Sequence, residues 1–373
     1  MKKALFALLS IALTACISTS GPKNIATGNH DDTLAVLQND QVNLSVSLYG
    51  GAIVGFRFKK DSLNPFTWKL RPADMPENNR KGAPFQGHFL CIGRWGSPTV
   101  GEKAAGIPHN GEPSNIWWKK EDPLSATILN MSVEPKLEPL TLHRTITLSE
   151  SDPCFVVDEK LSNHLNTGIF TAIVQHATIG PPFLDENTII SSNATYGFNQ
   201  TLAKPSIRKY EYQWPKGVAD TLFTSLDLTK SDQKEGFVTT HITEDEYGWV
   251  TAANTATGLL LGFLWKTSEY PWLHIWHGMK EGKLWAKGLE FGTTGLGDTF
   301  TPEKRATIDF HGVNNNQFID AGSSVTKKYF CFLIKIPLDF QKTDSVSYNS
   351  GIVTVKYLTD KEKFEINLNC KIW

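Results

Sequence analysis

The sequence predicts an all-β protein whose sheets are stacked into one large sandwich. Short segments that are β-branched or alternate apolar with polar residues recur along its whole length, bounded by Gly, Pro, Asn or Asp. No long window keeps a helical period with capping residues, and the strand–helix alternation of a parallel sheet is missing. A chain of 373 residues without helices must close or stack its sheets to cover their edges, which favours one large sandwich.

The strand pattern appears in segments spread over the whole chain. In order, they are residues 43–58, 142–148, 155–161, 188–192, 304–310, 329–336 and 352–357. No repeat occurs at the period of a propeller, and no low-complexity linker follows residue 32. We therefore expect one folded domain over residues 33–373.

The composition excludes some classes of protein. With 37 basic and 38 acidic side chains the formal net charge is -1, whereas nucleic-acid-binding proteins are normally strongly basic. A hydrophobic fraction of 40% and an aromatic fraction of 11% are typical of a globular protein with a large core. After Cys16 no apolar run approaches the roughly 18 residues that span a bilayer, so we expect no conventional transmembrane helix there.

The first sixteen residues have the pattern of an export signal. Lys2 and Lys3 precede an apolar stretch, residues 4–13, and the following residues up to Cys16 resemble the lipobox of bacterial lipoproteins. We expect a signal peptide over residues 1–15, a lipid on Cys16 and a flexible polar tether over residues 16–32. In bacterial lipoproteins an aspartate directly after the lipidated cysteine usually keeps the protein at the inner membrane. This chain has Ile17 at that position, which favours the outer membrane as its location. The alternative is a cleaved signal peptide without a lipid, which would leave the protein in the periplasm.

Residues 272–277, Trp-Leu-His-Ile-Trp-His, predict a wall for a bound sugar. In an extended strand Trp272, His274 and Trp276 lie on one face, and the two aliphatic residues between them lie on the other, where they can enter the core. Flat apolar rings beside hydrogen-bonding groups match a pyranose, which has an apolar C–H face and a rim of hydroxyls. The alternative interpretation is a tryptophan-rich core strand.

The sequence predicts no metal site. His274 and His277 are an odd number of residues apart, which points their imidazoles to opposite faces of a strand. The cysteines after the export signal have no Cys-x-x-Cys spacing; they are Cys91, Cys154, Cys331 and Cys370. In an oxidising compartment three disulfide pairings are open to these cysteines, and they can equally be buried thiols.

Glu290 is the candidate base. Alternation places Ala286, Gly288 and Gly292 on its face of a strand, so almost no side chain surrounds its carboxylate. Such a cavity lets a substrate approach a partly desolvated carboxylate, an environment that raises the pKa of a glutamate toward that of a useful base. The alternative is a glutamate on the solvated face of a strand weakened by glycine.

His176 is the candidate proton donor. The sequence Gly180-Pro181-Pro182 cannot continue a paired strand, so we expect the strand to end at His176 with its imidazole facing an opening. A histidine there can donate a proton near neutral pH. We expect His176 and Glu290 to face a common hollow, with room for one hexose between them.

Four groups of residues occur in the order and approximate spacing of a known family. They are Gly93-Arg94-Trp95; Pro108-His109-Asn110-Gly111-Glu112 with Trp117-Trp118; Gln175-His176 with Gly180-Pro181-Pro182-Phe183; and Gly288-Leu289-Glu290-Phe291-Gly292-Thr293-Thr294. In this combination the chain resembles the aldose 1-epimerase (galactose mutarotase-like) superfamily. It resembles the less characterised bacterial branch of that superfamily more than the best-known enzymes. The resemblance covers roughly residues 43–336.

The resemblance implies a large antiparallel β-supersandwich, with the sugar in a cleft on one sheet and no metal or organic cofactor. By position, His176 matches the family's general acid, which acts on the ring oxygen of the sugar, and Glu290 matches its general base, which acts on the anomeric hydroxyl. Arg94 and His109 match residues that bind the substrate. The other candidates for substrate binding are Trp272, His274, Trp276 and His277.

The leading hypothesis is therefore a mutarotase of the cell envelope that acts on a mono- or oligosaccharide. A lipid-anchored glycan-binding protein without turnover is one alternative, and a polysaccharide lyase or hydrolase on the same scaffold is another. The chain departs from the family after Arg94, where Trp95-Gly96-Ser97 follows and the family's Asn-Arg pair is missing. The sugar is therefore not specified by the resemblance.

Overall fold

A computed structural model of the chain describes residues 33–122, 125–200, 211–219, 222–229, 235–297 and 310–372. The predicted signal peptide, the lipidation site Cys16 and the tether lie outside these ranges, and so does the predicted strand at 304–310 except for Phe310. Within the described ranges, no helix is both long enough and apolar enough to cross a membrane.

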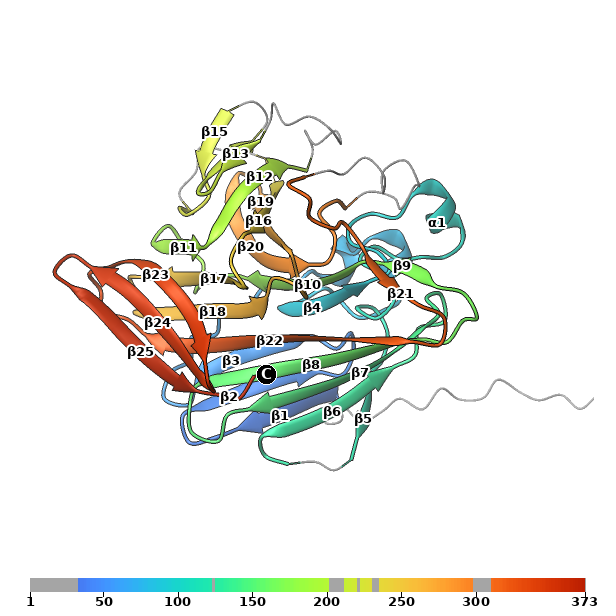
Figure 1. Cartoon of the computed structure of the whole chain (residues 1–373), viewed down its shortest axis with the longest axis horizontal. Helices are drawn as coiled ribbons and strands as arrows, with labels where there is room; N and C mark the ends of the chain where they lie inside the picture. Colours follow the sequence, from blue (N-terminus) through green and yellow to red (C-terminus); the bar gives the residue numbers. More distant parts are fainter. Residues whose placement is uncertain are drawn as a thin grey trace, which may run out of the picture.

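The predicted all-β class is confirmed, and most strands belong to two large sheets (Figure 1). The ten-stranded sheet has the order β1 (Leu34–Gln38), β2 (Val42–Ser47), β3 (Ile53–Phe58), β4 (His88–Ile92), β10 (Ile173–Ile179), β20 (Lys283–Gly292), β19 (Trp272–Lys280), β16 (Phe237–Thr243), β12 (Ala194–Asn199) and β13 (Tyr212–Gln213). The eight-stranded sheet has the order β11 (Thr188–Ser192), β17 (Tyr247–Asn254), β18 (Leu259–Lys266), β22 (Ser324–Lys335), β8 (Cys154–Asn163), β7 (Leu140–Leu148), β6 (Ile128–Val133) and β5 (Lys119–Glu121). The pairings between these described strands are antiparallel.

Smaller elements complete the described part of the chain. The small sheets are β14 (Lys216–Ala219) with β15 (Leu222–Ser225), β9 (Ile169–Thr171) with β21 (Gln317–Ile319), and β23 (Phe340–Asn349) with β24 (Ile352–Thr359) and β25 (Lys363–Asn369). The helical segments are α1 (Val100–Ala104) and two 3-10 turns, η2 (Pro72–Asp74) and η3 (Glu77–Asn79). These short helical segments agree with the prediction that the chain has no long helices.

The main core lies between the two large sheets. Ile173, Ala177 and Ile179 of β10 belong to one buried cluster with Phe155 of β8 and Phe263 of β18. Because side chains alternate along a strand, Val174, His176 and Thr178 of β10 face away from this core. The outer face of the ten-stranded sheet is therefore available for a binding site.

The C-terminal sheet covers the other face of the eight-stranded sheet. Leu260 and Phe330 from that sheet are buried together with Val346, Val355 and Leu368 of β23, β24 and β25. Figure 1 shows this sheet, in red, at one end of the molecule. The predicted strand at 352–357 thus belongs to a separate layer that shields the sandwich from solvent.

Two strand boundaries differ from those predicted. Residues 43–58 form two strands, because Gly50 and Gly51 turn the chain with φ values of +88° and +64°. A Cβ atom at Gly50 would lie 2.8 Å from the carbonyl oxygen of Ser114, so glycine is required there. The prediction that the strand ends at His176 is wrong: β10 continues to Ile179 and still pairs with β20 there, so His176 lies within the sheet.

A buried ion pair supports β10 from the core side. Glu159 Oε1 accepts hydrogen bonds from Arg144 Nε at 2.8 Å and Nη2 at 2.7 Å, and both side chains are almost completely buried. Glu159 Oε2 accepts a hydrogen bond from Nε2 of Gln175, the neighbour of His176, at 2.7 Å. The strand that carries His176 is thus tied to β7 and β8 through side chains as well as through packing.

Candidate active site

A pocket of about 610 Å³ opens on the outer face of the ten-stranded sheet. Its aromatic lining consists of Trp68, Phe85, Phe89, Trp95, Trp276 and Trp285. Its polar lining includes Asp74, Ser97, His109, Asn110, His176, Gln200 and Glu290. A concave site of this size, with many apolar rings and a few converging polar groups, is typical of small-molecule binding.

His176 and Glu290 meet on the floor of this pocket. The imidazole Nε2 of His176 lies 3.3 Å from Glu290 Oε1, and the two side chains are 11% and 2% exposed. The structure thus brings the two candidate residues into one hollow, as expected. The expected space for a hexose between them is missing, because the two groups touch.

Gly288 makes room for the Glu290 carboxylate. Gly288 precedes Glu290 by two residues on the same face of β20 and lies opposite Trp276 of β19. A Cβ atom at Gly288 would lie 2.5 Å from Glu290 Oε1 and 2.9 Å from the Cβ atom of Trp276. Real Cβ atoms do not approach other atoms so closely, so a side chain here would displace the carboxylate from His176.

We expect Gly288→Ala to slow any reaction that uses the His176–Glu290 contact by about 10–100-fold, because the added methyl group pushes the carboxylate aside. The measurement is the rate of sugar anomer exchange, with folding checked by circular dichroism. Gly101→Ala is the matched control, because a Cβ atom at Gly101 meets nothing within 4 Å. An unchanged rate in a folded Gly288→Ala protein would show that the contact has no catalytic role.

Trp95 holds the second oxygen of Glu290. Its indole Nε1–H donates a hydrogen bond to Glu290 Oε2 at 2.8 Å, and its ring packs against that of His274 at a centroid distance of 4.0 Å. His274 is in turn held by Thr240, whose Oγ1 lies 2.8 Å from Nδ1. We did not select Trp95 from the sequence as a site residue. Its place in the Gly93-Arg94-Trp95 motif was the signal that could have identified it.

The ring of His176 packs against neighbouring aromatic rings and is held at Nδ1. Phe89 of the neighbouring strand β4 stacks on it at a centroid distance of 4.3 Å and an interplanar angle of 18°. Trp68 lies nearly parallel to it at 6.4 Å. Nδ1 of His176 lies 2.9 Å from Thr178 Oγ1. Nε2 is therefore the nitrogen that faces Glu290.

Burial shifts both pKa values toward the neutral forms. Burial raises the pKa of Glu290 from 4.5 to about 8, although the hydrogen bond from Trp95 opposes the shift. Burial also lowers the pKa of His176 from 6.5 to about 3, with a further contribution from nearby His109. At neutral pH the pair is therefore a carboxylic acid 3.3 Å from a neutral imidazole, and not an ion pair.

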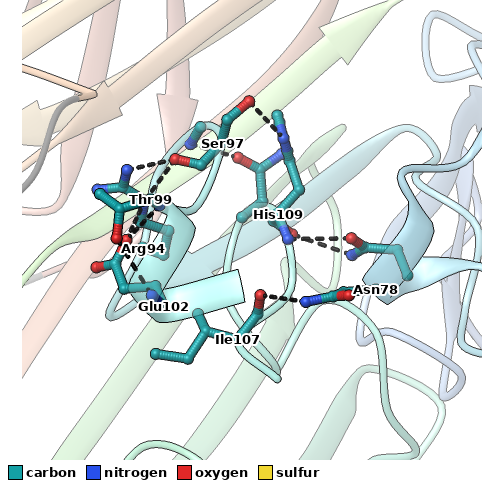
Figure 2. Close-up of polar contacts among 10 residues, drawn as sticks. Asn78, Arg94, Ser97, Thr99, Glu102, Ile107 and His109 are labelled. Carbon is teal, nitrogen blue, oxygen red and sulfur yellow. Dashed lines mark hydrogen bonds and ion pairs between the residues drawn. The ribbon is translucent and has the colours of Figure 1, made fainter. Parts of the chain in front are cut away.

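Arg94 points toward Ser97 and Glu102 (Figure 2). Its guanidinium hydrogen-bonds the carbonyl oxygen of Ser97, 2.8 Å from Nε, and its Nε lies 3.6 Å from Glu102 Oε2. The same Glu102 carboxylate accepts the backbone N–H of Thr99 at the start of α1. Arg94 does not line the pocket, so its predicted contact with substrate is wrong. It instead braces the loop that carries Trp95 and Ser97 to the pocket.

His109 does line the pocket. Its Nδ1 lies 3.2 Å from Ser97 Oγ, and its backbone N–H donates to Asn79 Oδ1 at 3.0 Å. Burial and, to a smaller extent, the nearby charge of Arg94 lower the pKa of His109 to about 4, so the ring is neutral at pH 7. The position agrees with the predicted role of His109 in substrate binding, which remains a prediction.

The wall predicted at residues 272–277 is present only in part. β19 places Trp276 in the pocket lining, whereas His274 is buried behind Trp95. Trp272 is fully buried against Phe198, and its Nε1–H donates to the carbonyl oxygen of Asn314 at 2.7 Å. The prediction that Trp272 and His274 contact the sugar is therefore wrong, because other segments cover both rings.

His277 lies on the face of β19 opposite to that of His274 and Trp276, as the alternation of side chains predicts. Its ring stacks on Phe237 at a centroid distance of 5.1 Å, and its Nδ1 lies 3.4 Å from Lys287 Nζ. The prediction that it binds substrate is wrong, because it is buried away from the pocket. Across the described ranges, no group of three or more His, Cys, Asp or Glu side chains is placed to hold a metal ion.

Several solved structures share this fold at low sequence identity. A galactose mutarotase related enzyme from Lactobacillus acidophilus matches with a TM-score of 0.57 and 9% identity, over 82% of this chain and 98% of that chain. A protein from Escherichia coli K12 described as a "putative aldose 1-epimerase" matches with a TM-score of 0.56 and 14% identity, over 82% and 99%. A Klebsiella pneumoniae protein of the same description matches with a TM-score of 0.56 and 17% identity, over 80% and 78%. The chain therefore has the galactose mutarotase-like fold.

At the level of sequence, one family model matches. It is described as "Domain of unknown function (DUF4432)", and it covers residues 116–310. This range includes His176 and Glu290 but not Trp95 or His109. No curated protein matches the chain.

Proposed function

The chain belongs to the family described as a domain of unknown function (DUF4432), and we propose that it is a sugar isomerase of the aldose 1-epimerase kind. The contact between His176 Nε2 and Glu290 Oε1, on the floor of a pocket rich in aromatic rings, carries the proposal. Structural neighbours described as aldose 1-epimerases or mutarotase-related enzymes support a sugar as the substrate.

The pair can supply both an acid and a base from one proton. Opening a cyclic hemiacetal requires removal of the proton on O1 and delivery of a proton to the ring oxygen O5. Transfer of the Glu290 carboxyl proton to His176 Nε2 gives a carboxylate base and an imidazolium acid without any proton from solvent. The pair thus has the protonation states that the reaction needs, although burial favours its neutral form.

In the proposed reaction the sugar replaces the contact between the two side chains. Its anomeric hydroxyl binds at Glu290 and its ring oxygen at His176, which requires the two groups to move apart. Glu290 accepts the O1 proton while His176 gives its proton to O5, so the C1–O5 bond breaks and a C1=O1 carbonyl forms. Rotation of the open-chain aldehyde and the reverse proton transfers close the ring as the other anomer.

Exchange between anomers is directly measurable. Saturation-transfer NMR or polarimetry on glucose and galactose should show faster exchange in the presence of the protein, with most of the acceleration lost in Glu290→Gln. Catalysis by the wild type that Glu290→Gln leaves intact would contradict the proposed roles.

A glycan-binding protein without turnover is the second candidate function. The observation that favours it is that both carboxylate oxygens of Glu290 are already bound by Trp95 and His176, which leaves no gap for a sugar. Equal affinity of the wild type and Glu290→Gln for a sugar, with no exchange in either, would establish this alternative. Cleavage of a polysaccharide, the third hypothesis, would be recognised by product analysis.

We also propose that the protein is anchored to the bacterial cell envelope through a lipid on Cys16. The support is the sequence pattern of residues 1–16. Metabolic labelling with radioactive palmitate should label the wild type and not Cys16→Ala, which should no longer sediment with membranes. Equal labelling of both proteins, or no labelling of either, would contradict the anchor.

Export has a consequence for Cys154 and Cys370. The structure has both as free cysteines, and Cys370 lies close enough to Cys154 to raise the pKa of its thiol. In an oxidising compartment a thiol oxidase would take two electrons and two protons from them, and a disulfide between β8 and the end of the C-terminal sheet would form. We expect Cys154 and Cys370 of exported protein to resist a thiol reagent under denaturing conditions until a reductant is added. Reaction of both thiols without reductant would contradict this prediction.

A further inference from the structure

We propose that the pocket binds the reducing end of an uncharged oligosaccharide, with the first unit at His176 and Glu290 and the next unit beside Trp276 and Trp285. This inference rests on the proposed function and specifies its substrate class. Three properties of the pocket carry it: its extent, the absence of a lysine or arginine from the part of its lining that the structure describes, and its row of tryptophans.

The pocket is larger than one sugar ring requires. Its volume is about 610 Å³. Pockets of about 300–1,000 Å³ enclose ligands of drug size, which have more atoms than a single hexose. The lining extends from Glu290, whose side chain is 2% exposed, to Asp74 at the surface. A hexose at the floor therefore leaves the outer part of the pocket unfilled.

The described lining offers no lysine or arginine to a phosphate or carboxylate. Among the described residues that line the pocket none is a lysine or an arginine. Arg94, the cation that the family resemblance assigns to substrate binding, is turned to Ser97 and Glu102. A charged sugar would lose its hydration without gaining an opposite charge, which disfavours its binding.

The charges at the rim balance one another. Asp74 forms ion pairs with Arg71 at 2.7 Å and with Lys280 at 3.4 Å, and Glu281 lies close enough to act on the charge of Arg71. Two positive and two negative side chains thus stand together at the mouth. Neither Arg71 nor Lys280 is left to select an anionic sugar.

Three tryptophans form the wall that leads from the floor to the rim. The ring of Trp68 lies 5.4 Å from that of Trp276 and 5.7 Å from that of Trp285. Trp285 is half-buried, and Lys280 Nζ lies 5.2 Å from the centre of its ring. Trp68 is buried, and the half-buried rings of Trp276 and Trp285 offer apolar surface to the C–H faces of a sugar. One hexose beside the His176–Glu290 pair would leave Trp285 without a ligand.

A panel of reducing sugars tests the inference. It contains glucose and galactose, their 6-phosphates, their uronic acids, and the disaccharides maltose, cellobiose and lactose. We expect kcat/KM for anomer exchange to be at least about 10-fold higher for one disaccharide than for its reducing-end monosaccharide, and at least about 10-fold lower for the charged sugars. A charged sugar as the best substrate, or no gain from any disaccharide, would overturn the inference.

The substitution Trp285→Ala tests where the second sugar unit binds. We expect it to raise KM for the preferred disaccharide by about 10-fold and to affect the monosaccharide less, because stacking of the second ring is lost. Trp117→Ala is the matched control, since Trp117 is a half-exposed tryptophan outside the pocket lining. Equal effects of Trp285→Ala on mono- and disaccharide would contradict the placement of the second unit.

Binding measurements separate this inference from the proposed function. Isothermal calorimetry with the Glu290→Gln protein reports affinity without turnover. If no sugar is isomerised but a disaccharide binds more tightly than its monosaccharide in a way that depends on Trp285, the proposed function fails and the inference holds. If monosaccharides are isomerised and disaccharides show no advantage in binding or turnover, the function holds and the inference fails.

Discussion

Glu290→Gln is expected to lose at least about 100-fold in the rate of anomer exchange while retaining the fold. The carboxamide has the shape of the protonated carboxyl group, so its oxygen can accept from Trp95 and its NH2 group can donate to His176. It cannot become a carboxylate, and removal of a general base commonly lowers a rate by about 10²–10⁴-fold. Polarimetry on purified protein measures this loss.

The same substitution is expected to change how stability depends on pH. The pKa of Glu290 is raised in the folded protein from 4.5 to about 8, so the stabilisation from the protonated form is present below pH 4.5 and is lost as the pH rises through about 8. A glutamine does not ionise in this pH range, so the variant does not lose stability in this way as the pH rises. Relative to wild type, Glu290→Gln should therefore gain on the order of 4 kcal/mol in free energy of unfolding between pH 4.5 and 8.

Glu138→Gln is the matched control for this experiment. Burial raises the pKa of Glu138 to about 8 as well, and Glu138 is buried outside the pocket lining. Denaturant titrations at several pH values should show the same trend in both variants, with anomer exchange lost only in Glu290→Gln. A parallel loss of activity in Glu138→Gln, or a pH-independent difference between wild type and Glu290→Gln, would contradict the assignment.

Glu159→Ala is expected to destabilise the fold by about 3–5 kcal/mol, because it leaves the guanidinium of Arg144 buried without its partner. Glu159 also accepts hydrogen bonds from Gln175 and, at 3.5 Å, from Tyr270, so the substitution removes the acceptor that these groups share. Equilibrium unfolding in urea measures the change.

The double variant Arg144→Met/Glu159→Leu separates burial of a charge from loss of packing. Since it removes both charges, it should be closer in stability to wild type than Glu159→Ala is. A double variant that is less stable than the single one would mean that the ion pair itself holds the sheets together. The double variant also removes the carboxylate that Gln175 binds. The effect of the double variant on anomer exchange would therefore report how strongly the position of His176 depends on Gln175.

Much of the strand placement could be predicted because it depends on a local period. Alternation placed Leu273 and Ile275 in the core and Trp276 on the face of the pocket, and all three lie there. It also placed Gly288 on the face of Glu290, where the structure needs a residue without a side chain. Each of these predictions concerns residues on one strand, where the pleated geometry alone determines which face a side chain occupies.

The errors concern contacts between distant parts of the chain. Whether Trp272 lines a pocket depends on Asn314 and Phe198, which cover it, and no period within β19 contains that information. The direction of Arg94 depends on Glu102, whose carboxylate also caps α1. The 3.3 Å contact between His176 and Glu290 results from the packing of β4, β10 and β20 with the loop of Trp95, and the sequence contains no measure of that distance.

The pH dependence of anomer exchange is the most direct test of a proton shared by His176 and Glu290. The pair binds one proton between the pKa of His176, about 3, and that of Glu290, about 8, and only this form can act as acid and base together. We predict a kcat/KM, the quantity that reports the free protein, that is constant from pH 5 to about 7.5 and falls about tenfold per pH unit well above 8. A kcat/KM that falls from pH 6.5 upward, as an ordinary histidine acid would give, would contradict the shared proton.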